Sequence, residues 1–136
     1  FDPSVTFSFT ILKDLADAFA KIIEEREKHY LAEYTACSTG PTSYSDVVTA
    51  LSKEIGRPIQ IVQKDYFKSV EVFEDLVSGG SGSLPRYPRD ALQRLILYYN
   101  FYGIKGNTNV LEWLIGRRPT TVEDFLRQKI LDAQRS

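Results

Sequence analysis

The stretch YTACSTGPTSYSDVVTALSKEIGRPIQIV, residues 34–62, decides the fold class of this 136-residue chain. It overlaps a strand-like run, LAEYTACS at residues 31–38, which the turn residues TGP close. A helical pattern follows at residues 44–56, and PIQIVQ at residues 58–63 alternates as a short strand does. The order of strand, helix and strand predicts an α/β unit.

The helix at residues 44–56 has recognisable ends. Ser43 or Ser45 is a suitable N-cap, Gly56 is a suitable C-terminal stop, and Pro58 prevents the helix from resuming. Its apolar residues share one face: Val47, Val48, Leu51 and Ile55. We therefore expect an amphipathic helix here.

Upstream, VTFSF at residues 5–9 alternates apolar and hydroxyl side chains, which predicts a half-buried strand. Thr10 is the expected N-cap of a helix over residues 11–25. The apolar residues of this helix form one stripe: Leu12, Leu15, Ala16, Phe19, Ile22 and Ile23. The stripe is expected to face the core.

Downstream, Asp65 is the expected cap of a helix over residues 66–78. GGSGS, residues 79–83, has the composition of a flexible linker, so residues 78–87 are expected to form a mobile loop. This Gly/Ser segment is either native or an engineered replacement.

Three more helical patterns complete the chain, at residues 88–103, at residues 109–116 and after Pro119. Thr120 lies three residues before Glu123, the spacing of a capping box. We expect a helix-rich α+β lobe within the α/β class, one domain over residues 1–136, with about three short strands and five to six helices.

The composition limits the classes of partner. Seventeen basic and eighteen acidic residues give a formal net charge of -1, so no global field favours nucleic acid. One cysteine and one histidine do not supply the usual zinc clusters. No apolar run approaches the roughly 20 residues that cross a bilayer. A cytoplasmic protein with no metal, membrane or nucleic-acid partner is expected.

Three signatures in order carry a family resemblance: FTILKDLADAFAKI, then YTACSTGPTSYSDVVTALSKEIGRPI, then NVLEWLIGRRPTTVEDFLR. With them, nearly the whole chain resembles the C-terminal half of NmrA-like proteins, which are atypical short-chain dehydrogenase/reductases. The resemblance implies the substrate-binding lobe of an extended Rossmann-type fold. In that family the other, N-terminal lobe binds NAD(P).

The chain itself has no dinucleotide fingerprint, because its one glycine cluster lies between two helices instead of between a strand and a helix. We therefore expect no cofactor within this chain, and NAD(P) is implied by the resemblance alone. The start at Phe1 and the absence of methionine favour a piece of a longer product. In that case the missing partner is the N-terminal Rossmann lobe. A naturally shortened relative is the other explanation, with its strand edges paired in a homodimer.

Three functions follow as hypotheses. The first is the substrate-binding lobe of an NAD(P)-dependent oxidoreductase or redox-sensing regulator, as the resemblance implies. The second is a cofactor-independent isomerase, cyclase or lyase of secondary metabolism. The third is a regulatory module that binds a protein partner.

Aromatic residues are the strongest candidates for a binding site. They cluster in the helices at residues 66–78 and 88–103, and aromatic walls with polar tips suit a flat organic ligand. The expected ligand is a small aromatic or polyketide-like molecule. The candidate lining residues are Tyr66, Phe67, Phe73, Tyr87, Tyr98, Tyr99 and Tyr102.

The candidates for catalysis are fewer. Glu71 is a possible general base if it faces an apolar pocket, and His29 is a possible proton shuttle, but a solvated helix face and a structural turn are the alternatives. Cys37 is more typical of a small buried residue than of a nucleophile. Trp113 is expected to anchor the last two helices. Arginines that could hold an anion or a partner's acidic face are Arg86, Arg89, Arg94, Arg117 and Arg118, and amides that could orient a ligand are Asn100, Asn107 and Asn109.

Overall fold

The computed structural model describes residues 2–80 and 84–135. Within them the chain is a helical α+β structure with a small antiparallel sheet of two strands. The strands are β1 (Thr6–Phe7) and β2 (Thr42–Ser43). The six α-helices of the described residues are α1 (Leu12–Glu25), α2 (Tyr44–Ile55), α3 (Tyr66–Ser78), α4 (Arg86–Tyr102), α5 (Asn109–Ile115) and α6 (Val122–Arg135), and a 3-10 turn, η1 (Arg26–His29), follows α1.

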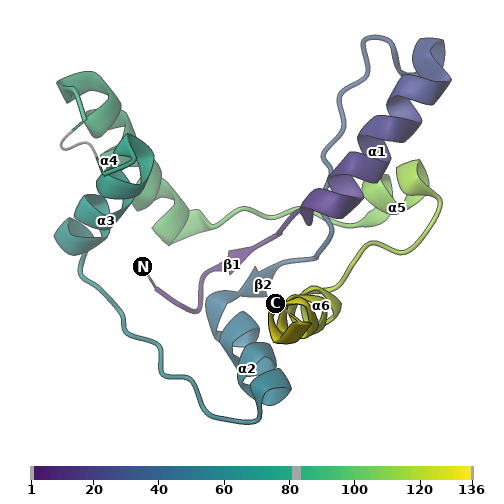
Figure 1. Ribbon diagram of the computed structural model, residues 1–136. Helices are drawn as coiled ribbons and strands as arrows, with labels where there is room; N and C mark the ends of the chain where they lie inside the picture. Colours follow the sequence, from purple (N-terminus) through teal and green to yellow (C-terminus); the bar gives the residue numbers. More distant parts are fainter. Residues whose placement is uncertain (1, 81–83, 136) are drawn as a thin grey trace.

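The helices pack in three pairs that form two arms and a floor (Figure 1). α3 and α4 form one arm, and α1 with α5 forms the other. α2 and α6 lie together at the floor, beside the sheet. Two of the three pairs join helices from opposite halves of the chain, so the N-terminal and C-terminal segments fold as one unit.

The two strands cross the floor at the base of both arms. β1 pairs with β2 in the register Thr6 with Ser43 and Phe7 with Thr42. The segment after α4 joins the other edge of β1, where Ser8 donates its backbone N–H to the carbonyl of Ile104 at 2.7 Å. This contact connects the α3/α4 arm to the floor.

The strands expected at residues 31–38 and 58–63 are not formed. A strand needs a neighbour along its length, and within the described residues neither segment has one. Ser38 and Thr39 contact the segment that follows β1, where both of their backbone N–H groups donate to the carbonyl of Phe9. The expectation of about three strands was therefore wrong, whereas that of five to six helices is confirmed.

Helix ends follow the sequence at most sites. Ser43 caps α2 in a capping box with Asp46, and Asp65 caps α3 by accepting the Lys68 N–H. Gly56 ends α2 in the left-handed conformation, as expected.

Two expected caps were wrong. The Thr10 hydroxyl donates to the carbonyl of Ala36, and Ile11 precedes α1 without a side-chain cap. The side-chain cap of α6 lies one residue later than expected: the Thr121 hydroxyl accepts the Asp124 N–H and donates to the Asp124 carboxylate. Thr120 instead binds Asp14 of α1.

The segment expected as a loop at residues 78–87 is shorter than that. Ser78 is the last residue of α3, and Arg86 and Tyr87 already belong to α4. The expectation of a mobile loop falls partly on residues 81–83, which lie outside the described residues. The buried Glu74 of α3 accepts the Leu84 N–H at 2.8 Å and pairs with Arg89 of α4 at 3.2 Å.

The core is small and lies between α1 and α5. Ala18, Leu111 and Leu114 form it, with Ile22 and Tyr34 packed against it. Neither α2 nor α6 has a fully buried side chain. The buried residues of α1 are Asp14 and Ala18. The apolar stripe that the sequence predicts on this helix is only partly buried.

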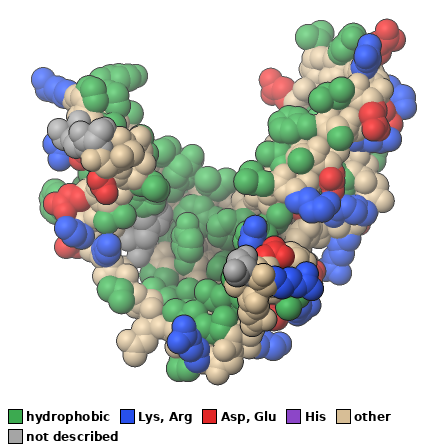
Figure 2. Space-filling model, viewed as in Figure 1, with side chains coloured by type: hydrophobic (Ala, Val, Ile, Leu, Met, Phe, Trp, Pro, Cys, Tyr) green, Lys and Arg blue, Asp and Glu red, His purple; other side chains and the backbone are tan. Residues whose placement is uncertain are grey.

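The uncovered part of that stripe is large. Leu12 is 79% exposed, Phe19 is 55% exposed and Ile23 is 69% exposed. Ala16 of the same stripe is exposed as well. The expectation that the stripe faces the core was wrong for these four residues. Hydrophobic side chains gather on the inner sides of the arms and over the floor between them, where the surface is hollowed (Figure 2).

The total accessible area agrees with this picture. The chain exposes 9956 Å². A compact monomer of 15.5 kDa exposes about 7,200 Å². The excess of about 2,700 Å² is as large as the area buried in many stable protein interfaces.

Candidate functional site: the apolar floor

Three aromatic rings form the centre of the floor. Phe7 and Phe9 of the first strand segment lie 5.4 and 6.0 Å from Tyr44, measured between ring centroids. Tyr44 is held there because Ser43, just before it, both pairs with Thr6 and caps α2. The trio therefore depends on the strand register and the capping box together.

The larger of two apolar hollows at Tyr44 lies between the first turn of α1, α2 and α6, and we name it the α6 hollow. Its volume is about 730 Å³, within the range of small-molecule sites. Its walls are mostly apolar: Phe9, Ile11, Leu12, Tyr44, Val47, Val122, Phe125 and Leu126. Its polar rim is Thr10, Lys13, Thr120, Asp124, Gln128 and Lys129.

The second hollow lies on the other side of Tyr44, and we name it the α3 hollow. Its volume is about 420 Å³. The segment that follows α2 lines it together with α3, and its apolar residues are Pro3, Tyr44, Val48, Ile61, Val62, Val72 and Phe73. Because Tyr44 belongs to both hollows, its ring is a wall that they share.

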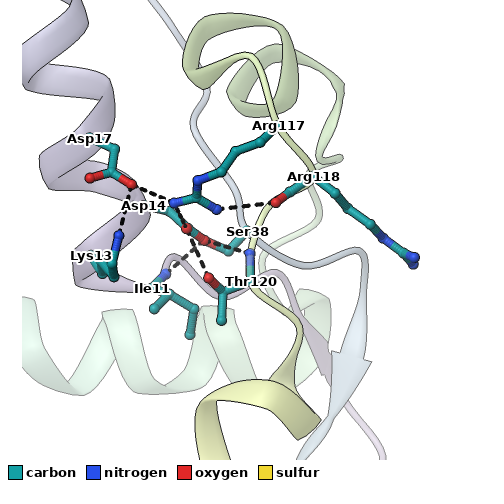
Figure 3. A network of polar contacts seen from close by, with 8 residues as sticks. All are labelled: Ile11, Lys13, Asp14, Asp17, Ser38, Arg117, Arg118 and Thr120. Carbon is teal, nitrogen blue, oxygen red and sulfur yellow. Dashed lines mark hydrogen bonds and ion pairs between the residues drawn. The ribbon is translucent and has the colours of Figure 1, made fainter. Parts of the chain in front are cut away.

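A buried carboxylate fixes the α1 side of the floor (Figure 3). Asp14 is 0% exposed. It accepts the Thr120 backbone N–H at 2.8 Å, the Thr120 hydroxyl at 2.9 Å and the Arg117 guanidinium at 2.8 Å. The network ties the first turn of α1 to the segment between α5 and α6, both of which border the α6 hollow.

The same contacts set the charge state of Asp14. Burial acts to raise the pKa of this carboxyl, but the hydrogen bonds from Thr120, Arg117 and Ser38 outweigh burial, so the pKa is lowered. Arg117 also pairs with Asp17, and this partner together with Asp14 raises the pKa of the guanidinium. Asp14 is thus a permanently charged anchor at neutral pH.

The predicted lining aromatics lie on the α3/α4 arm, and only one of the seven lines the α6 or the α3 hollow. Phe73 lines the α3 hollow. Tyr66 is half-buried and donates its hydroxyl to the Gln93 carbonyl at 3.3 Å. The α6 and α3 hollows include none of the remaining residues, which are largely on the surface except for the half-buried Tyr99: Phe67, Tyr87, Tyr98, Tyr99 and Tyr102.

The two catalytic candidates occupy different surroundings. Glu71 is exposed and pairs with Lys68 at 2.7 Å. His29 is buried, with its ring nitrogens 2.7 Å from the Tyr34 hydroxyl and 3.2 Å from Glu25. A hydrogen bond from Lys21 is the main cause that lowers the pKa of Glu25 to about 2. Neither Glu71 nor His29 lines the α6 or α3 hollow.

The structure assigns structural contacts to several other candidates. Cys37 is buried, as expected, and burial raises its pKa, which keeps the thiol protonated. Trp113 is 66% exposed, and its ring lies near His29 and Tyr34. The expectation that Trp113 anchors the last two helices was therefore wrong.

The polar candidates form internal contacts as well. Arg89 pairs with Glu74, and Arg94 pairs with Asp90 at 2.9 Å. Three further contacts follow: the Asn100 side chain accepts the Asp2 N–H, that of Asn107 accepts the Asn109 N–H, and the Arg118 carbonyl accepts from Arg117. The structure gives Arg86 an exposed position in the first turn of α4.

The sequence did not indicate the floor residues, because they come from distant segments. Phe9, Tyr44 and Phe125 are far apart in the chain, and only the pairing of β1 with β2 and of α2 with α6 brings them together. A faint signal existed in Asp14, a carboxylate among the apolar residues of α1.

Across residues 2–80 and 84–135, no His, Cys, Asp or Glu side chains form a group of three placed to hold a metal ion. In the same ranges no helix has the length and apolar character to cross a membrane. Comparison with protein-family models, with curated proteins and with solved structures found no match to this chain.

Proposed function

We propose that this chain is the small-molecule-binding lobe of an NmrA-like NAD(P)-dependent oxidoreductase or redox-sensing regulator. Its floor binds a flat, mostly apolar ligand. A separate Rossmann-type lobe, which holds the dinucleotide, covers the ligand from the open side. The sequence resemblance supports the family. The exposed apolar floor supports a protein in which this lobe binds the ligand and a second lobe binds the dinucleotide.

The observation that carries the proposal is the uncovered apolar floor between the two arms (Figure 2). The excess area of about 2,700 Å² beyond a compact monomer is large enough to be the contact surface of a covering lobe. Ligand sites occur preferentially at such interfaces between lobes.

The chemistry of the floor favours binding over acid–base catalysis by this chain. Aromatic rings of Phe9, Tyr44 and Phe125 offer flat surfaces for stacking. Asp14 is a buried carboxylate beside this floor, and its oxygens already accept hydrogen bonds from Thr120 and Arg117. A redox reaction at this site would therefore depend on the hydride of a nicotinamide that the other lobe supplies.

The test uses a neutral flat probe, 2-naphthol, titrated into the 136-residue chain and followed by amide chemical shifts. We expect shifts at Phe9, Tyr44 and Phe125, and weaker binding by Tyr44→Ala. Tyr30→Ala is the matched control, because Tyr30 is exposed, directly follows η1 and lines neither hollow.

A second titration with NADPH separates the two parts of the proposal. We expect no NADPH binding to this chain alone, since the dinucleotide site belongs to the covering lobe. Tight NADPH binding by the chain alone, or 2-naphthol shifts that avoid the floor, would contradict the proposal.

A further inference from the structure

We propose that the α6 hollow selects a flat aromatic carboxylate, with the ring against Phe9, Tyr44 and Phe125 and the anionic group at Lys129. The inference rests on the proposed function, because it names the ligand class of the same floor. The choice of ligand depends on which polar side chains around the hollow already have hydrogen-bond or ion-pair partners.

Most polar groups at the rim already have partners. Lys13 pairs with Asp17 at 3.1 Å, and the Gln128 amide donates to Asp132 at 2.8 Å. The Thr120 hydroxyl donates to Asp14. These groups have little capacity left for a ligand.

The acidic rim residue is also engaged. The Asp124 carboxylate accepts the Thr121 hydroxyl at 2.8 Å at the start of α6 and lies 3.5 Å from Arg127. Arg127 lies closer to Glu54, at 3.0 Å. Among the described residues Asp124 forms no ion pair with either lysine of the rim, Lys13 or Lys129.

Lys129 differs from the other rim residues. Its ammonium lies 5.8 Å from the centroid of the Phe125 ring, and among the described residues it forms no ion pair. Phe125 is itself a wall of the hollow. An uncompensated cation beside an apolar wall is complementary to a ligand that has an aromatic body and one negative charge.

The size of the hollow agrees with this ligand class. A volume of about 730 Å³ accommodates two or three fused rings with a substituent. Lys13, the other lysine of the rim, is paired with Asp17, so the preference for an anion depends on Lys129. The geometry thus favours an anion over a neutral ligand of the same shape.

The experiment compares two probes that have the same ring, 2-naphthoate and the neutral 2-naphthamide, on the 136-residue chain. We expect naphthoate to bind three- to fivefold more tightly, as an exposed ion pair allows, with the preference decreasing as salt increases. Lys129→Gln should abolish the preference. Lys53→Gln, which removes the same charge from the exposed surface of α2, should keep it.

The outcomes separate the two proposals. Equal affinity for both probes in the unmodified chain, or a preference that survives in Lys129→Gln, would overturn the carboxylate inference while the proposed function stands. Absence of binding by both probes, or shifts that fall outside the floor, would overturn both.

Discussion

At the scale of single residues, Asp14 shows how a buried charge is stabilised. It has no exposed surface, yet three donors from Thr120 and Arg117 replace the water that it loses. Removing one such charged hydrogen-bond partner leaves others unsatisfied, and this loss is usually larger than the gain from forming the pair.

We predict that Asp14→Asn lowers the free energy of unfolding by about 2–3 kcal/mol, because a charge-assisted network becomes neutral. Asp17→Asn is the matched control: Asp17 also binds Arg117, but it is partly exposed, so a much smaller effect is expected. Urea unfolding measures both. Equal effects of the two substitutions would show that Asp14 is no special anchor.

The pH dependence of the same residue has a defined sign. The pKa of Asp14 is lower in the folded state than the value of about 3.9 typical of unfolded chains, so the folded state holds fewer protons. Its contribution is full above about pH 4. It is lost as the pH falls through the folded pKa.

We therefore predict that the difference in unfolding free energy between the unmodified chain and Asp14→Asn shrinks below about pH 4. Urea titrations at a series of pH values measure it. A difference that stays constant down to pH 2 would contradict the lowered pKa.

The same residue shows what sequence reasoning can reach. The burial of Cys37 was predictable from residue type. The partners of Asp14 were not, because Arg117 and Thr120 lie more than a hundred residues away and only the packing of α1 against α5 brings them near.

At the scale of elements, helix ends carry the clearest consequences. Gly103 ends α4 with φ 63° and ψ -159°, a conformation that other residues rarely adopt. A Cβ on Gly103 would collide with the backbone carbonyl of Thr6 in β1. This close approach allows α4 to connect to the floor.

We predict that Gly103→Ala destabilises the chain strongly, by more than the roughly 1–2 kcal/mol of a left-handed residue alone. Gly56→Ala is the matched control, since it has φ 69° but nothing within 4 Å of a new Cβ. Thermal unfolding of both variants gives the comparison. Similar melting temperatures for the two would argue against the contact with β1.

The capping of α6 offers an independent test of register. Thr121→Ala should lower the free energy of unfolding by about 1 kcal/mol, because the Asp124 N–H loses its acceptor. Asp124→Ala should be more destabilising than Glu123→Ala, although both remove an acidic residue from the first turn. A larger loss of stability in Glu123→Ala than in Asp124→Ala would instead favour the capping box of Thr120 and Glu123 that the sequence predicts.

Helices were predictable from the sequence because their signals are local. The apolar periodicity and the caps of α2 and α3 are contained in their own residues. Strands at residues 31–38 and 58–63 were not formed, because a strand depends on a partner elsewhere in the chain, and β composition alone does not supply one.

At the scale of the whole molecule, the described residues have a small hydrophobic core. The core between α1 and α5 is small, and the floor helices α2 and α6 pack without a fully buried side chain. Apolar residues such as Phe19 and Ile23 were placed correctly on one helix but wrongly in the core. The spacing of apolar residues identifies the apolar face of a helix, but it does not indicate what packs against that face.

The central claim is that the apolar floor between two open arms is exposed until another lobe covers it. Small-angle X-ray scattering with simultaneous determination of mass tests this directly on the 136-residue chain. We predict a monomer near 15.5 kDa with a radius of gyration clearly above the roughly 14 Å of a compact chain of this length. A compact monomer near 14 Å, or a dimer that buries the floor between two copies, would contradict it.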